Sequence, residues 1–390
     1  MVAGHLQEKK GLFYMVLSYK DCTGKRRTKW FPTGLPVKGN KKRAEAMLME
    51  KRHSYVPEDS IENSVIESEM LFADYLDQWL KIVKSTIKLI TYASYVDAVE
   101  KRIKPYFREQ GITLADLQAS DIQRFYTIQL ERVKPTTVIY YHAVIHRALK
   151  YAVKTDLILS NPADKVDRPR KEAFQAGFYD KDELNALFGA VKGSQLEIPV
   201  MLAGFYGLRR SEVLGLKWDA IDFNNNTITI RHTITTFNVD GKRVTVASDT
   251  TKTKSSMRTL PLVPLFRERL LALKAEQLEN RRLSGKSYNM QYIDYICVDE
   301  IGDLTSPNYI TGAFPKLLER SGLRRIRFHD LRHSCASMLL ANGVAMKQIQ
   351  EWLGHSDFST TANIYAHLDY NSKLSSAEAM QIGLGLKVAE

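Results

Sequence analysis

Apolar residues recur at every third or fourth position along most of this chain. Between residues 70 and 155 this period predicts four helices, the last two covering 121–132 and 136–154. The expected inward faces of the first two are Leu71, Tyr75, Leu76, Trp79 and Val83, and then Tyr95, Val99, Ile103 and Tyr106. We therefore expect a compact, all-α domain here.

The first 56 residues follow a different pattern. Aromatic and branched residues fill LFYMVLSYK (12–20), DCTG (21–24) is typical of a turn, and KRRTKWF (25–31) reads as a returning strand. Residues 39–54 then have the composition of a helix. Phe13 and Tyr14 are expected in the core of this small sheet-and-helix module.

The remainder of the chain mixes both periods. Strands are expected at NNNTITIRHT (224–233), at the TLPL region near 259 and at YICV, 295–298. Helices are expected at 180–192, 197–206, 209–216, 264–283, 309–321, 329–342 and 345–353.

These patterns predict a multidomain α+β protein: a small N-terminal β-sheet-plus-helix module, an all-α four-helix domain and a mixed, mainly-α domain. Polar or proline-containing stretches mark the expected boundaries. The expected parts are 1–56, a linker at 57–69, a helical domain at 70–158, a linker at 159–174, a large domain at 175–375 and a tail at 376–390.

Basic residues exceed acidic ones by 12, and the pI is about 9.3. Thirteen basic and four acidic residues lie in the first 56, so most of the excess belongs to the N-terminal module. A solubilising surface is one explanation. Concentration in one small module favours a nucleic-acid contact, with Arg26, Arg27 and Lys29 as candidates.

Several other classes of function find no support in the sequence. Three isolated cysteines without a CxxC or Cys/His cluster indicate neither a disulfide framework nor a zinc site, which fits a reducing cytoplasm. The longest apolar runs, such as 198–207, are too short for a membrane span. No signal-peptide pattern or nucleotide-binding glycine motif is visible.

Four segments of the large domain carry candidate chemistry. They are YGLRRSEVLGLKW (206–218), TTKTKSSMRTLPL (250–262), FHDLRHSCASMLLANG (328–343) and EWLGHSDFSTTANIYAHL (351–368). Together, in this order and spacing, they resemble the tyrosine recombinase (phage integrase) family. The basic N-terminal module and the helical domain resemble the arm-binding and core-binding domains of integrases from temperate phages and conjugative transposons.

The resemblance implies a catalytic set made of Arg209, Lys252, His329, Arg332, His355 and Tyr365. A tyrosine can attack phosphorus and hold the cut strand as a 3′-phosphotyrosyl ester, which conserves the energy of the bond without ATP or a metal ion. Fixed guanidiniums suit the negative charge that develops on the phosphate oxygens. The resemblance implies that the lysine is the general acid for the leaving 5′-oxygen.

Some of these assignments have competitors. Lys254 competes with Lys252 as the general acid and otherwise contacts DNA; Tyr370 competes with Tyr365. Arg210 points about 100° around the helix from Arg209, so it is expected to make a phosphate or structural contact. Alternatively, both arginines form a surface network with Glu212 and Asp219. His333 is expected to pack or to make a polar contact at the N-terminal end of its helix.

The family further implies a homo-tetramer that exchanges strands of two duplexes through a Holliday junction, with core and arm DNA sites. Excision and DNA-bending proteins are possible partners, and residues 376–390 are expected to contact a neighbouring protomer. Three rival readings are a resolvase or chromosome-dimer recombinase of the same family, a catalytically silent DNA-binding regulator, and a type IB topoisomerase. The basic N-terminal module argues against the first, and the full catalytic set against the second.

Overall fold

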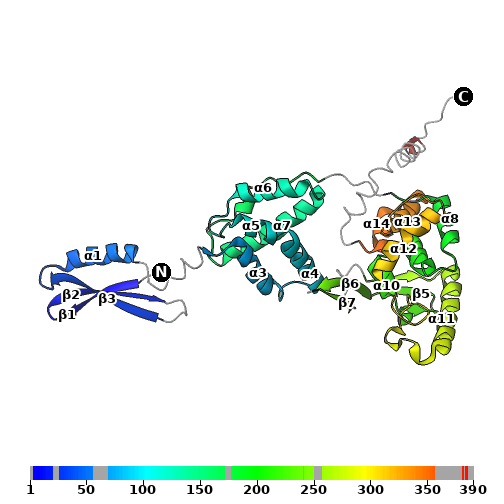
Figure 1. Ribbon diagram of the computed structural model, residues 1–390, viewed down its shortest axis with the longest axis horizontal. Helices are drawn as coiled ribbons and strands as arrows, with labels where there is room; N and C mark the ends of the chain where they lie inside the picture. The colour runs from blue at the N-terminus through cyan, green and yellow to red at the C-terminus, as the bar shows by residue number, and fades with distance from the viewer. Residues whose placement is uncertain are drawn as a thin grey trace. The chain divides into compact units, whose positions relative to one another are not determined.

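The structure is a computed structural model of the chain, which divides into two compact units, Met1–Glu172 and Ala173–Glu390. Each unit is described by itself, and Figure 1 shows the elements. The described residues are 3–20, 26–55, 69–171, 177–239, 241–249, 257–355, 380–381 and 383–384.

An antiparallel sheet and one helix form the N-terminal module. The strands pair in the order β1-β2-β3, and both predicted strands and the predicted helix are confirmed, while β1 was not predicted. Lys10 and Gly11 both have positive φ, of 52° and 76°, the conformation that a tight two-residue hairpin needs. The elements are β1 (Ala3–Lys9), β2 (Leu12–Lys20), β3 (Arg26–Pro36) and α1 (Lys41–Ser54).

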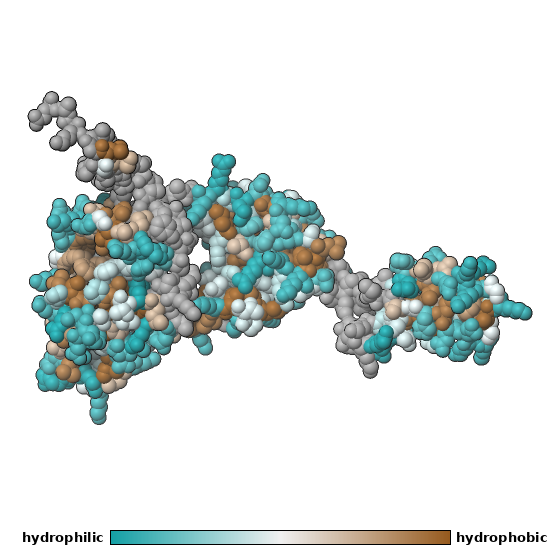
Figure 2. Space-filling view, turned by 180° about the vertical axis from the view of Figure 1, so that it is seen from behind, coloured by the Kyte–Doolittle hydropathy of each residue, from teal (hydrophilic) through white to brown (hydrophobic). Residues whose placement is uncertain are grey.

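The two faces of this sheet differ. Phe13, Met15 and Leu17 of β2 are buried on the face that α1 covers, as the twofold period of a strand requires. Tyr14 lies on the opposite face, where its ring meets the edge of Trp30 at 6.3 Å between centroids. Tyr14 is therefore only partly buried, in contrast to its expected core position, and Trp30 is 43% exposed. In Figure 2, apolar side chains lie among hydrophilic ones on the visible side of this module.

Four helical segments form most of the described range 69–171, as the sequence predicts. The second segment is continuous but contains a π-helical turn at Val99–Ile103, which inserts one residue into the helical repeat. Beyond that turn the buried aromatic is therefore Phe107, in place of the expected Tyr106. The elements are α3 (Phe72–Val83), α4 (Leu89–Ala98), α5 (Lys104–Gln110), α6 (Ala119–Leu130) and α7 (Pro135–Lys154).

The first part of the segment 159–174, which was expected to be a linker, has regular structure. Pro162–Lys165 forms a short 3-10 helix against α6 and α7. The Asn161 side chain accepts a hydrogen bond from the Ala163 amide at 3.0 Å, and the His146 imidazole lies 2.7 Å from an Asp164 carboxylate oxygen. These contacts attach residues 161–165 to the helical domain because they satisfy the polar groups of the turn.

The second unit confirms the seven predicted helices. Its strands form the sheet β4-β5-β8 and a separate hairpin β6-β7 that was not predicted. The strand expected at 295–298 is wrong: Tyr295 and Val298 make only isolated bridges, to Lys217 and Leu304. Its helices are α8 (Lys181–Val191), α9 (Glu197–Tyr206), α10 (Arg210–Gly215), α11 (Pro264–Ser284), α12 (Pro307–Arg320), α13 (Asp330–Ala341) and α14 (Met346–Leu353). Its strands are β4 (Ile221–Asp222), β5 (Thr227–Ile230), β6 (Thr233–Val239), β7 (Lys242–Ser248) and β8 (Arg258–Pro261).

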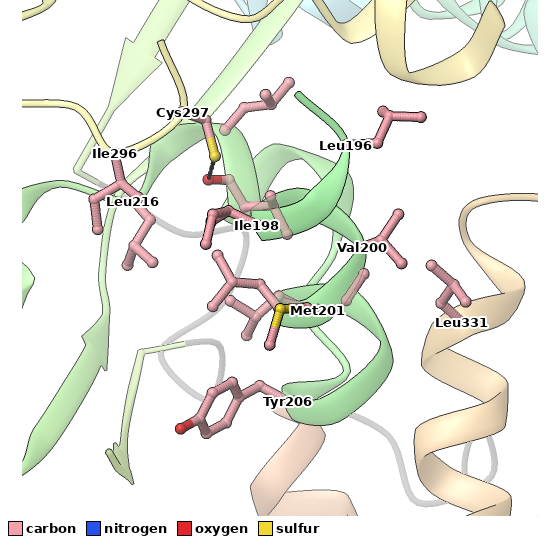
Figure 3. Packing of buried hydrophobic residues seen from close by; sticks show 14 of the residues in the cluster. Leu196, Ile198, Val200, Met201, Tyr206, Leu216, Ile296, Cys297 and Leu331 are labelled. Atoms are coloured by element: carbon pink, nitrogen blue, oxygen red, sulfur yellow. Dashed lines mark hydrogen bonds between the residues drawn. The ribbon is translucent and has the colours of Figure 1, made fainter. Parts of the chain in front are cut away.

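Helix α9 runs through the centre of the second unit's core. Its residues are apolar on almost every side, which is typical of a helix surrounded by other elements. Figure 3 shows Leu216 and Ile296 on one side of α9 and Leu331 of α13 on the other. The Cys297 thiol donates a hydrogen bond to the Val213 carbonyl at 3.5 Å. Within the described residues, no helix is long and apolar enough to cross a membrane.

Gly207 ends α9 at a point of very close packing. Its φ is 65°, and a Cβ atom there would lie 2.3 Å from Cδ2 of Leu353 in α14. We expect Gly207→Ala to lower the free energy of unfolding by about 2–4 kcal/mol, from left-handed strain plus overpacking. Urea denaturation of the full chain measures this. Gly193→Ala is the matched control, because its φ is 75° but nothing lies within 4 Å; an equal loss in both variants would contradict the packing argument.

Candidate active site

Arg209 stands at the N-cap of α10, directly after the turn that ends α9. Its backbone N–H donates to Oε2 of Glu212 at 3.0 Å, and its Nη1 donates to Oε1 of the same carboxylate at 2.5 Å. An acidic residue three positions into a helix reaches back to the N-cap in this way because the first backbone N–H groups lack helical partners. The Arg209 side chain remains one-third exposed, at 33%.

Glu212 is buried between two guanidiniums. Its Oε2 also accepts from Nη2 of Arg258 at 3.0 Å, and its side chain is 2% exposed. Burial raises the pKa of the Glu212 carboxyl, but Arg258 and Arg209 outweigh it, so the pKa lies below its ordinary value. The carboxylate is therefore ionised at neutral pH.

Arg332 lies on α13 and is 2% exposed. It donates from Nη1 to the Gly207 carbonyl at 2.6 Å, from Nη2 to the Leu353 carbonyl at 2.7 Å and from Nε to Nε2 of His355 at 3.2 Å. Desolvation and the nearby Arg209 guanidinium lower the pKa of Arg332 to about 9, so the group stays charged at neutral pH. Its three bonds fix the guanidinium in one orientation.

The C-terminal end of α14 joins these groups. The carbonyls of residues 352–354 accept, in order, from Arg258 at 2.8 Å, Arg332 at 2.7 Å and Arg209 at 3.1 Å. Carbonyls in the last turn of a helix have no helical partner and carry the negative end of the helix dipole. Three cations consequently converge on one helix end.

His355 follows that helix end and is 8% exposed. Desolvation, Arg332 and Arg209 lower the pKa of its imidazole to about 3, so the ring is neutral at physiological pH. Because Nε2 accepts from Arg332, the ring proton belongs on Nδ1. His355 is thus a neutral donor beside two guanidiniums.

His329 precedes Arg332 by three residues at the start of α13. Its ring meets that of His333 edge-on, with centroids 5.5 Å apart. Desolvation, His333 and Arg332 lower the pKa of His329, although the residue is exposed. His333 packs as expected, and its Nδ1 is buried without a hydrogen-bond partner among the described atoms. No group of three or more His, Cys, Asp or Glu side chains in the described ranges could hold a metal ion.

Comparison with known proteins identifies the family to which the chain belongs. Residues 178–372, half of the chain, match the phage integrase family, and residues 71–130 match the phage integrase N-terminal SAM-like domain. The chain belongs to the phage integrase family. This membership confirms the resemblance drawn from the sequence, and with it the activity class, site-specific DNA recombination.

Two curated integrase-family relatives illustrate the similarity. A tyrosine recombinase XerC-like protein of Caldanaerobacter subterraneus subsp. tengcongensis is 27% identical over 87% of this chain and 89% of its own length. The ICEBs1 integrase of Bacillus subtilis is 28% identical over 59% of this chain and 61% of its own length.

Solved structures share the integrase fold. The Tn1549 transposon integrase in complex with a circular intermediate DNA has a TM-score of 0.63 at 18% identity, covering 78% of this chain and 99% of that one. A lambda integrase dimer bound to a core site has a TM-score of 0.57 at 17% identity, covering 92% and 93%. These likenesses support the multidomain α+β fold expected from the sequence.

The integrase fold brings together three of the six catalytic residues expected from the sequence. Arg209, Arg332 and His355 share the helix end described above, and His329 lies one turn before Arg332. Lys252 and Tyr365 lie outside the described residues. The same holds for their competitors Lys254 and Tyr370.

Arg210 departs from its neighbour. Its Nη1 donates to the Pro307 carbonyl at 3.4 Å and hydrogen-bonds Oγ1 of Thr311, so it ties α10 to α12. The structural alternative for Arg210 therefore has direct contacts in its favour. The surface network that would have joined both arginines to Asp219 is not formed, because Asp219 pairs with Arg231 at 2.8 Å.

The three basic candidates of the N-terminal module lie on β3 and alternate between the sheet faces. Arg26 is on the open face, where its Nε donates to Oγ of Ser18 at 3.1 Å. Arg27 and Lys29 are on the helix-covered face, and Lys29 Nζ lies 6.0 Å from the centre of the Tyr55 ring. The sequence analysis did not assign the three side chains to different faces of the sheet.

Sequence reasoning missed Glu212 and Arg258 as parts of the site. Glu212 had a local signal, since an acid three residues after an N-cap commonly completes a capping box. Arg258 lies in the segment 250–262 that the sequence singled out, but its contact with Glu212, 46 residues away, had no local signal because it forms only through the fold.

The buried carboxylate generates a pH-dependent prediction. Glu212→Gln should lower the free energy of unfolding by about 3–5 kcal/mol at pH 7, because two guanidiniums lose their partner. The pKa of Glu212 is depressed on folding, so its contribution is present above the unfolded value of 4.5 and is lost as the pH falls below it. Urea denaturation across pH should show the two proteins converging in acid.

Glu279→Gln is the control for this measurement. Glu279 pairs with Arg282 on the surface, three residues along α11. Its removal should leave the free energy of unfolding nearly unchanged at every pH, since exposed pairs contribute little. A Glu212→Gln deficit that persists in acid would mean that the loss comes from packing rather than charge.

Proposed function

We propose that this chain integrates and excises a mobile element by cutting and rejoining DNA through a 3′-phosphotyrosyl intermediate and a Holliday junction. Family membership supplies the activity class. The proposal adds the covalent chemistry, the residue roles and the kind of element, a conjugative transposon or temperate phage.

One observation supports it above the others, which is the charge of the buried cluster. Arg209, Arg258 and Arg332 lie around a single buried carboxylate, Glu212, so positive charge exceeds negative charge among these four side chains. Like charges held close together repel one another. A phosphodiester carries one negative charge and gains more as it becomes pentacovalent, so it would balance this excess best in the transition state.

Donor capacity is consistent with a phosphate ligand. The described contacts of Arg332 use three of its five N–H donors, one each on Nη1, Nη2 and Nε. Arg209 retains a one-third exposed side chain. In the proposal these two guanidiniums hold the non-bridging oxygens, and His355 and His329 donate further hydrogen bonds.

The reacting groups in this proposal are Tyr365 and Lys252. Tyr365 gives its phenolic proton to water and attacks phosphorus; the P–O bond to the 5′-oxygen breaks, and Lys252 gives that oxygen a proton. A tyrosine with an ordinary pKa of about 10 is mostly protonated at neutral pH, so nearby cations would favour its ionised form. Attack by another 5′-hydroxyl reverses the step and joins new partners.

The proposed partners are double-stranded core and arm DNA sites and three further copies of the chain. Lambda integrase has been solved as a tetramer bound to a Holliday junction, and that chain shares the fold with a TM-score of 0.57 at 18% identity. We assign the inter-protomer contact to residues 376–390, of which Met380 and Leu384 are both 64% exposed. Lys254 and Arg210 remain candidate DNA contacts, with excision and bending proteins as possible accessory partners.

The arm-site contact is assigned to the N-terminal module. Its open sheet face combines the cation Arg26 with the paired aromatics Tyr14 and Trp30, and Lys9 Nζ lies 5.6 Å from the Trp30 ring centre. Basic and aromatic side chains on one exposed surface suit phosphate and base contacts. Arg27 and Lys29 would act from the opposite face.

The covalent intermediate is directly testable. Nicked suicide duplexes drawn from candidate element ends should give a protein–DNA adduct that survives denaturant, without metal or ATP. Tyr365→Phe should abolish the adduct because the attacking oxygen is missing, and Tyr370→Phe should retain it. An adduct that persists in Tyr365→Phe would refute the nucleophile assignment.

A leaving-group substitution tests the general acid. Lys252→Ala should slow cleavage of an ordinary duplex by about 10²–10⁴-fold. A substrate with a 5′-thio leaving group needs no acid, so the same variant should cleave it nearly as fast as the unaltered protein. Rescue of Lys254→Ala instead would exchange the roles of the two lysines.

A further inference from the structure

Arg258 is a buried cation within the segment 250–262 that carries the family resemblance, but neither that resemblance nor the proposed reaction gives it a role. It begins β8, pairs with Ile230 of β5, and its side chain is 6% exposed. Burying a guanidinium is costly unless its donors find acceptors of good geometry. The burial of the Arg258 side chain therefore needs a physical explanation.

The contacts of Arg258 join two elements of the active site. Nη2 and Nη1 lie 3.0 Å and 3.5 Å from the two oxygens of Glu212, and Nε donates to the Trp352 carbonyl at 2.8 Å. Glu212 is the carboxylate that holds Arg209. The Trp352 carbonyl belongs to the helix end that also holds Arg209 and Arg332.

We infer that Arg258 is a positioning residue for catalysis, which holds Glu212 and the end of α14 so that Arg209 and Arg332 meet the scissile phosphate correctly. This inference rests on the proposed function. Arg258 does not touch the phosphate in this arrangement, because its described contacts direct the guanidinium toward protein acceptors.

The role has an electrostatic part as well as a geometric one. Glu212 accepts from Arg209 and Arg258 together, so neither arginine alone neutralises it. Without Arg258, the full carboxylate charge would act on Arg209 and reduce its attraction for the phosphate. The loss would be felt most in the transition state, where the phosphate charge is greatest.

A planar guanidinium is needed for both contacts. Lysine carries the same charge but presents one ammonium, which cannot span the carboxylate and the Trp352 carbonyl in the same fixed geometry. Arg258→Met keeps much of the apolar stem and removes every donor. Arg258→Lys and Arg258→Met together therefore separate charge from geometry.

The test compares single-turnover cleavage of a suicide duplex with equilibrium binding of the same duplex, at a temperature where each variant remains folded. We expect Arg258→Met to cleave about 100-fold more slowly while its Kd changes less than about threefold, since small misplacements of binding groups act on the chemical step. Arg258→Lys should restore only a small part of the rate. A 5′-thio substrate should not rescue either variant, because the defect lies in phosphate positioning and not in the acid.

Arg269→Met is the matched control for simple structural damage. Arg269 is another arginine of the second unit that bonds a buried carboxylate, with Nε 3.1 Å from Glu197, away from the site. Both methionine variants should lower the midpoint of thermal unfolding, but only Arg258→Met should slow cleavage. Equal cleavage rates in Arg258→Met and Arg269→Met would overturn the inference.

A double-mutant cycle tests the route through the carboxylate. In a Glu212→Gln background, Arg258→Met should cost less than about threefold in cleavage rate, because the partner that it positions is already altered. If Arg258→Met slows cleavage by the same factor with and without Glu212→Gln, Arg258 does not act through Glu212.

A second measurement tests the role of Arg258 even if the proposed function is wrong. Failure of the unaltered protein to form any adduct would refute the proposed function alone. The Arg209 guanidinium NMR signal would then decide the inference: sharp in the unaltered protein and in Arg269→Met, but exchange-broadened in Arg258→Met. A sharp, unshifted Arg209 signal in Arg258→Met would overturn it.

Discussion

The C-terminal end of α14 is the point on which the active site depends. Three consecutive carbonyls, of residues 352–354, each accept from a different arginine. Like charges this close repel one another, and the carbonyls together with Glu212 offset that repulsion. Gly207 allows α14 to approach closely, and its own carbonyl fixes Arg332. The helix end therefore orients the cations before any ligand arrives.

Under the proposed function, this arrangement would favour phosphate binding at some expense of stability. The three guanidiniums outnumber the one carboxylate, Glu212, and burial together with Arg332 and Arg209 lowers the pKa of His355 to about 3. An anion would relieve both effects, because it would stabilise the guanidiniums and the protonated form of the ring. In the proposed reaction, a phosphodiester would offset the repulsion among the guanidiniums, and this would stabilise a charged transition state selectively.

Arg209 and Arg210 show how adjacent, identical side chains acquire different roles. Arg209 has an extended N-cap backbone, and Glu212 and α14 hold its side chain in the site. Arg210 begins the helix proper and bonds residues 307 and 311 of α12. A change of backbone conformation at a helix start sends consecutive side chains in different directions. The two roles follow from that boundary.

The sequence by itself determined most of the helices, because helical periodicity is a local property, and its ordered motifs determined the family and the candidate residues. Local pattern failed at 295–298, where apolar residues are buried in a loop and form no strand. Only the tertiary structure decided that Glu212 and Arg258 contact each other beside Arg209. Their meeting joins residues 46 positions apart, and no local period encodes such a distance, because it depends on how β8, α10 and α14 pack together.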